Sequence, residues 1–126
     1  MLKELYYYLT TPCPKPFRQL GYLSDLIAIQ ARYQRVGTAW HQHLHNSRQL
    51  IRDSSALRPQ HRNAVVLGSG LLLDVPLEAL SQQFSQVVLV DIAHLQSVTK
   101  QVNAYHNVTL LEHDITGLSQ PLGAKF

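Results

Sequence analysis

A chain of 126 residues with 45% hydrophobic residues can form one globular domain with a modest core, and is too short for two. Its net charge of +3 is mild, and its single cysteine, Cys13, excludes an internal disulfide. No apolar run approaches the length of about 20 residues that spans a bilayer, and the N-terminus lacks the apolar stretch and cleavage site of a secretory signal. These features predict a cytoplasmic protein that has no membrane partner.

The charges are unevenly distributed along the chain. Between residues 32 and 62 there is one acid, Asp53, and there are six arginines: Arg32, Arg35, Arg48, Arg52, Arg58 and Arg62. Such a bias is typical of a surface that meets anions, and also of a solvated helix face. No aromatic residues are interleaved in the way that nucleic-acid binding favours, so nucleic acid is not the expected partner.

The first part of the chain has helical patterns. Residues 2–9 predict a short helix, and the three prolines between residues 12 and 16 favour an extended segment because proline stops a helix. Apolar residues then recur at three- and four-residue steps from Leu23 to Ile51, which predicts a long amphipathic helix. Gly37 is a weak point that would divide this helix in two.

Two histidines of this helix, His41 and His45, share one face. Two ligands do not complete a zinc site, and the H-E-x-x-H pattern is absent, so no metal is predicted. Trp40 is expected to pack in the core.

After Asn63 the pattern changes. Three short apolar runs, rich in β-branched residues, alternate with two helical patterns. The runs lie at residues 64–68, 87–91 and 108–114, and the helical patterns at 75–84 and 93–105. This alternation predicts an α/β fold with parallel strands, helical crossovers and cover on both faces of the sheet. Residues 117–126 are expected to form a loop.

Ligands of an open parallel sheet bind beyond the carboxyl ends of its strands. Here those ends carry the turn Gly68-Ser69-Gly70, then Asp91, then Asp114. Glycine leaves room for a ligand and permits positive φ. A carboxylate at the position of Asp91 can accept both hydroxyls of a ribose, and Asp114 can accept an adenine amino group or lie beside the ring.

The turn departs from known phosphate-binding patterns. A dinucleotide site requires G-x-G-x-x-G, whereas the sixth position here is Leu73, and Asp74 brings a negative charge to the place of the pyrophosphate. Asp74 is expected to cap the next helix, with Pro76 in the first turn. The P-loop pattern is absent. The strand ends together predict an adenosyl ligand without a pyrophosphate, which is S-adenosylmethionine.

The stretch from Ala64 to Gly117 resembles the first half of a class I, Rossmann-like S-adenosylmethionine-dependent methyltransferase. "VVLGSG" resembles the first motif of that family, "VVLVD" the second and "EHD" the next strand end; bacterial members also have a similar Asp-x-Pro-Leu helix start. The resemblance implies a helical cap over residues 1–62 and a cofactor-binding half-domain over 63–126. The implied cofactor-binding residues are Gly68, Ser69, Gly70, Asp91, Ile92, Asp114 and Ile115.

Two features depart from the family pattern. Leu72 stands where the motif often has a third glycine, and three of the usual seven strands are recognisable. The methyl acceptor and the catalytic residues are therefore not assigned. The first strand is central in the family's sheet, so its open edge is expected to promote self-association. The alternative interpretation is a non-catalytic nucleotide-binding or interaction module that retains a Rossmann-like fold.

Overall fold

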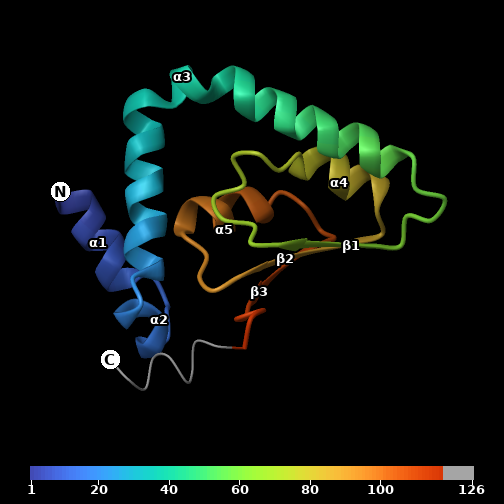
Figure 1. Ribbon diagram of the computed structural model, residues 1–126. Coiled ribbons are helices and arrows are strands. Elements are labelled where there is room, and N and C mark those ends of the chain that lie inside the picture. Colours follow the sequence, from blue (N-terminus) through green and yellow to red (C-terminus); the bar gives the residue numbers. More distant parts are fainter. Residues whose placement is uncertain (118–126) are drawn as a thin grey trace.

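The computed structural model describes residues 1–117, which form five helices and three strands (Figure 1). In chain order they are α1 (Leu2–Thr10), α2 (Lys15–Gln19), α3 (Tyr22–Ala56), β1 (Asn63–Leu67), α4 (Leu77–Gln83), β2 (Gln86–Asp91), α5 (Gln96–Val102) and β3 (Val108–Glu112). The loop predicted at residues 117–126 lies, from residue 118 onward, outside the described residues. None of the described helices is long and apolar enough to cross a membrane.

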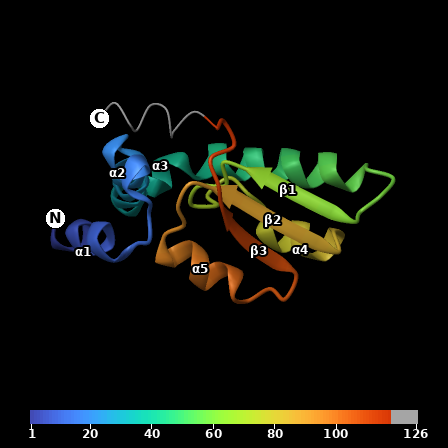
Figure 2. The same ribbon diagram turned by 90° about the horizontal axis from the view of Figure 1, so that it is seen from below.

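The three strands form a parallel sheet in the order β1-β2-β3 (Figure 2). The register aligns Val65 with Val88 and Val88 with Thr109. The fold therefore belongs to the α/β class, as predicted. β2 is the central strand of the described sheet, and β1 lies at its edge.

The described helices α3, α4 and α5 lie on one face of this sheet (Figure 1). Both crossovers, through α4 and α5, step in the same direction along the sheet, and right-handed crossovers then place both helices on the same face. Val87 and Leu89 point to that face and are fully buried, whereas Val65 and Leu67 alternate to the other face and are 58% and 61% exposed. The expectation of cover on both faces is wrong for residues 1–117.

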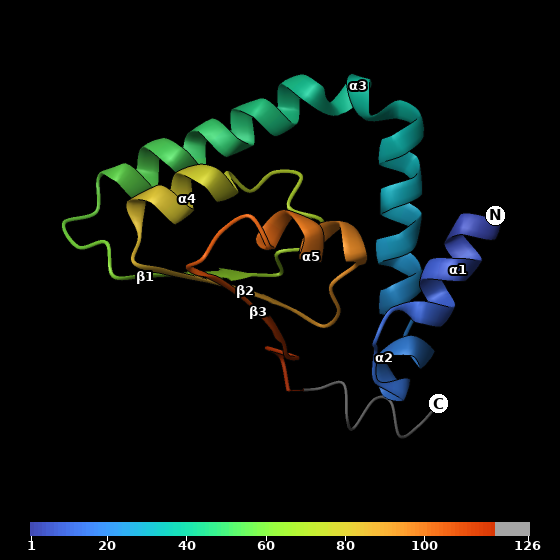
Figure 3. The ribbon, with the colours of Figure 1, turned by 180° about the vertical axis from the view of Figure 1, so that it is seen from behind.

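The long helix α3 consists of two arms that meet at a kink. Val36 has non-helical backbone angles (φ −131°, ψ 18°) directly before Gly37, at the predicted point of division. The second arm lies over α4, and α5 lies between α4 and the first arm (Figure 3). The hydroxyl of Ser97 on α5 donates to Oε1 of Gln30 on the first arm at 2.9 Å. Trp40, just past the kink, is half-buried and packs on Tyr33 outside the main core, so its predicted core position is wrong.

The proline-rich segment contains a helix where an extended chain is expected. Pro14 precedes α2 with extended angles (φ −58°, ψ 145°), and Pro16 lies in the first turn of the helix. Proline is tolerated in a first turn because its missing N–H has no helical partner there. The prediction of an extended segment is therefore wrong from Lys15 onward.

Arg18 of α2 ties the N-terminal helices together. Its guanidinium donates to the carbonyl oxygens of Tyr8 (2.6 Å), Thr11 (2.7 Å) and Cys13 (3.1 Å), and lies 4.9 Å from the centre of the Tyr8 ring. Burial raises the pKa of the Cys13 thiol, and the charge of Arg18 opposes this shift only in part. This cysteine is therefore a poor nucleophile at neutral pH.

Candidate functional site

The carboxyl ends of the three parallel strands meet at one edge of the sheet. β1 runs directly into Gly68, β2 ends at Asp91, and Asp91 is in register with Glu112 at the end of β3. The residues that follow each strand therefore lie side by side. The parallel pairing thus brings together strand ends that are far apart in the sequence.

The glycine turn is held tightly against β2. The backbone N–H groups of Gly68 and Ser69 both donate to the carbonyl oxygen of Val90, at 2.8 and 3.2 Å. Gly68 has φ +70° and Gly70 has φ +55°, a region that favours glycine. A Cβ atom on Gly68 would meet nothing within 4 Å, so open space lies beside the turn.

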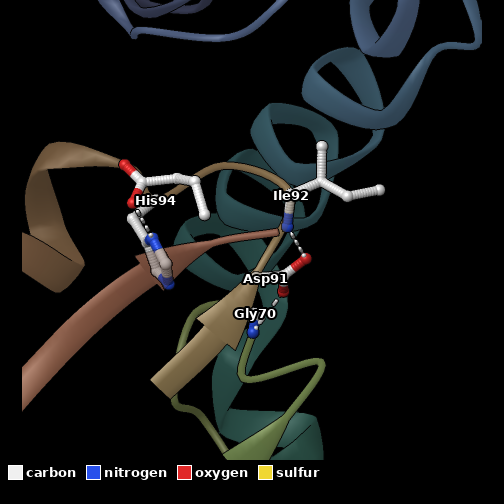
Figure 4. A network of polar contacts seen from close by, with 5 residues as sticks. Gly70, Asp91, Ile92 and His94 are labelled. Atoms are coloured by element: carbon white, nitrogen blue, oxygen red, sulfur yellow. Dashed lines mark hydrogen bonds and ion pairs between the residues drawn. The ribbon is translucent and has the colours of Figure 1, made fainter. Parts of the chain in front are cut away.

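Asp91 links the turn to the end of β2. One carboxylate oxygen accepts the N–H of Gly70 at 2.7 Å, and the other accepts the N–H of Ile92 at 2.7 Å (Figure 4). The side chain is half-buried, so these bonds orient the carboxylate in a fixed position. A carboxylate has about four lone-pair sites, and two of them remain for a ligand.

A pocket of about 180 Å³ lies beside Asp91. Five of the seven predicted cofactor-binding residues line it: Gly68, Asp91, Ile92, Asp114 and Ile115. The other two follow Gly68 in the same turn, where Gly70 bonds to Asp91 and Ser69 is 3% exposed. The Ser69 hydroxyl has no hydrogen-bond partner among residues 1–117, which is costly for a buried polar group.

Asp114 is engaged in a local turn. Its Oδ1 accepts both the N–H of Thr116 at 3.0 Å and the hydroxyl of Thr116 at 2.6 Å. This arrangement fixes the wall of the pocket formed by residues 113–116. The orientation of the Asp114 carboxylate, which could contact an adenine, is therefore set by a residue only two positions away in the sequence.

Four lining residues of the pocket are absent from the sequence-based prediction: Tyr22, Val90, His113 and Thr116. Tyr22, the first residue of α3, reaches the strand ends from the N-terminal helices and is 43% exposed. His113 follows β3 directly and lines the same pocket. The position of His113 after an apolar run is a signal that sequence reasoning could have used, whereas no local pattern marks Tyr22.

His94 lies three residues after β2 ends and does not line the pocket. It is 6% exposed, and its Nδ1 lies 3.6 Å from Oε2 of Glu112, a contact that forms an ion pair only when the imidazole is protonated (Figure 4). Neither ring nitrogen has a hydrogen-bond partner within residues 1–117. In the same part of the chain, no group of three or more His, Cys, Asp and Glu side chains is placed to hold a metal ion.

The loop after the glycine turn packs into the protein. Leu71 and Leu72 are buried, and the guanidinium of Arg48 on α3 donates to the carbonyl oxygen of Leu73. Asp74 is exposed and does not cap α4, which begins three residues later at Leu77, so the predicted cap is wrong. The buried leucines anchor the loop after the turn in the core.

Comparisons of the chain with known protein families, with curated proteins and with solved structures find no match.

Proposed function

We propose that this chain binds the adenosyl group of S-adenosylmethionine at the strand ends, as the donor-binding portion of a Rossmann-like methyltransferase. The observation that carries the proposal is the Asp91 carboxylate, fixed by the N–H groups of Gly70 and Ile92 beside the pocket. Such a carboxylate at the end of the second strand of a parallel sheet is suited to the two hydroxyls of a ribose.

Each wall of the pocket has a chemical counterpart in the nucleoside. The two unused lone-pair sites of Asp91 would accept the ribose hydroxyls. Ile92 and Ile115 offer apolar surface for the adenine ring, and Tyr22 offers an aromatic ring from α3. The open space beside Gly68 leaves room for the ligand to approach the backbone.

The bound donor supplies an electrophilic methyl group on a sulfonium, and the protein's task is to position it and exclude water. The residues described above would hold the nucleoside end in one orientation. These residues account for the nucleoside end of the donor alone, so no class of methyl acceptor is proposed.

A non-catalytic nucleoside-binding module is the second candidate, favoured by the volume of the pocket. The pocket of about 180 Å³ is smaller than the roughly 300–1,000 Å³ of sites for drug-sized ligands. It would enclose one part of the donor rather than all of it. Competition distinguishes the candidates: a donor site prefers S-adenosylhomocysteine to adenosine by at least about tenfold, whereas a nucleoside module binds both equally.

Titration calorimetry with S-adenosylhomocysteine tests the proposal. Asp91→Ala should weaken binding by about 1.5–3 kcal/mol, because it removes hydrogen bonds to a charged group. Asp53→Asn is the matched control, since Asp53 lies outside the pocket and its carboxylate accepts a hydrogen bond from Gln49 on the exposed surface of α3. This control should bind like the parent.

Asp91 also holds the glycine turn in place, so its replacement could destabilise the fold. The melting temperature of each variant is therefore measured together with its binding. A folded Asp91→Ala variant that binds as tightly as the parent contradicts the assignment. So does the absence of any binding by the folded parent.

A further inference from the structure

The N-terminal helices contribute one wall of the pocket beside Asp91, which we call the strand-end pocket. Among the described residues that line this pocket, Tyr22 alone comes from the part of the chain before β1. The three strands point toward the side of the molecule on which α2 and the first arm of α3 lie (Figure 2). Tyr22 begins that arm, so two separate parts of the sequence form the pocket together.

The ring of Tyr22 is positioned by its neighbours in the chain. Gly21 has φ +87°, so the chain enters α3 from a left-handed turn. Leu23 is fully buried in the core, which fixes the first turn of the helix. The ring of Phe17 on α2 lies 6.4 Å from the Tyr22 ring in an edge-to-face arrangement. Tyr22 nevertheless stays 43% exposed, so it offers a positioned aromatic surface that a ligand can cover.

The chemistry of this wall suits the base of a nucleoside rather than its sugar. Tyr22 lines the same pocket as Ile92 and Ile115, whose side chains are apolar. An aromatic ring stacks favourably on a planar base, whereas a ribose has no aromatic face and needs hydrogen bonds. The pocket therefore pairs a carboxylate for the sugar, Asp91, with an aromatic ring for the base.

A hydrogen bond outside the pocket holds the arm that carries Tyr22. The hydroxyl of Ser97 on α5 donates to Oε1 of Gln30 at 2.9 Å, and Gln30 is 9% exposed. Gln30 lies about two helical turns after Tyr22 on the same arm. Neither Gln30 nor Ser97 lines the strand-end pocket. Their bond can therefore act on a ligand there through the placement of the first arm.

We propose that the N-terminal helices select for the base of the ligand, which rests on the proposed binding of an adenosyl group. Tyr22 stacks on the adenine, and the Gln30–Ser97 pair is the positioning contact that keeps Tyr22 in place. Binding of the base and docking of the first arm are then coupled, because both stabilise the same position of the Tyr22 ring.

Two ligands separate the base from the sugar. S-ribosylhomocysteine keeps the ribose and the amino-acid end of S-adenosylhomocysteine but carries a hydroxyl in place of adenine. In calorimetric titrations, Tyr22→Ala should weaken binding of S-adenosylhomocysteine about three- to tenfold and leave S-ribosylhomocysteine unchanged. Tyr22→Phe keeps the ring and should bind both ligands like the parent. Tyr6→Ala, which removes an exposed ring on α1 outside the pocket, is the matched control.

A double-mutant cycle tests the positioning contact. Ser97→Ala should weaken binding of S-adenosylhomocysteine about two- to fourfold, and Ser97→Thr, which keeps the hydroxyl, should restore it. In a Tyr22→Ala background, Ser97→Ala should have no further effect on affinity, because the ring through which it acts is absent. A bond that merely stabilises the fold would give the same loss in both backgrounds.

The outcomes distinguish this proposal from the donor function itself. Melting temperatures show whether each variant is folded, and Tyr22→Leu, which keeps apolar bulk without an aromatic face, replaces Tyr22→Ala if the latter unfolds. A parent that binds S-adenosylhomocysteine while the folded Tyr22 variant binds it equally well overturns the role of Tyr22 alone. Equal losses for both ligands, or a Ser97→Ala effect that persists without the ring, also overturn it. A folded parent that binds neither ligand contradicts the donor function, and this proposal with it.

Discussion

Leu72 has a backbone conformation that ordinarily belongs to glycine. Its φ of +63° is positive, and it is the one non-glycine residue in the described part of the chain with this property. The left-handed region costs a residue with a Cβ about 1–2 kcal/mol. The side chain is 5% exposed, so burial in the core offsets that strain. The strain lies where the methyltransferase motif that the sequence resembles often has a third glycine.

The balance between backbone strain and side-chain burial predicts an unusual order of stability for the glycine and alanine variants of Leu72. Leu72→Ala loses the buried side chain and keeps the strain, whereas Leu72→Gly loses the side chain and relieves the strain. We expect both variants to be destabilised by about 2–5 kcal/mol, with the glycine variant about 1 kcal/mol more stable than the alanine variant. Urea denaturation measures the difference.

Leu80 provides the matched control for this comparison. It is buried to a similar extent (4% exposed) but lies within α4, where glycine costs about 1 kcal/mol more than alanine. The order of the two variants should therefore be reversed at Leu80. The same order at both positions would show that Leu72 is not strained.

At the scale of elements, the kink in α3 positions both halves of the protein. The first arm packs against the N-terminal helices and brings Tyr22 to the strand ends, and the second arm covers α4. A Cβ atom on Gly37 would lie 2.8 Å from two atoms of the Tyr33 ring. A side chain larger than glycine at this position would therefore displace the Tyr33 ring.

The kink predicts the outcome of a double-mutant cycle. In an ordinary helix Gly→Ala stabilises by about 1 kcal/mol, but Gly37→Ala must displace the Tyr33 ring from its contact with Trp40, so we expect no gain. In a Tyr33→Ala background, Gly37→Ala should stabilise by about 1 kcal/mol. Thermal unfolding of the four proteins measures this coupling. Equal effects of Gly37→Ala in both backgrounds would contradict it.

Some of the helices and strands could be predicted from the sequence, and others could not. The three strands and two crossovers are marked by local composition and spacing, so their order and parallel pairing could be predicted. The helix at Lys15–Gln19 was missed because the same prolines that end one helix can begin another. The prediction that both faces of the sheet are covered was wrong because an apolar run does not indicate on which face the crossover helix packs.

Part of the candidate site could likewise be predicted from the sequence, and part could not. Gly68, Asp91 and Asp114 follow apolar runs directly, and the parallel sheet then brings them together. Tyr22 reaches the pocket only through the packing of α3, which no short pattern encodes. The bonds from Asp91 to Gly70 and Ile92 likewise depend on the register between β1 and β2.

For the whole molecule, the two ends of the β1 strand have opposite electrostatic character. Arg58 and Arg62 line a groove next to the start of β1. The pocket beyond its other end contains Asp91 and Asp114 and no lysine or arginine. The excess of arginine in residues 32–62 is therefore separated from the strand ends, and an anionic group has no positive partner in the pocket lining.

This separation predicts that the strand-end pocket rejects dinucleotides. A pyrophosphate would meet the carboxylates of the pocket, and the start of α4 offers no replacement, because Pro76 and Leu77 are buried and proline has no N–H to donate. We expect NAD⁺ to bind more weakly than S-adenosylhomocysteine by at least about 1.4 kcal/mol, a factor of ten. Calorimetric titration of one protein preparation with each ligand measures the ratio, and adenosine serves as the control that lacks both the pyrophosphate and the amino-acid end. Micromolar binding of NAD⁺, at or above the affinity for S-adenosylhomocysteine, would show that the acidic pocket does not select against phosphate and would overturn the preference for S-adenosylmethionine.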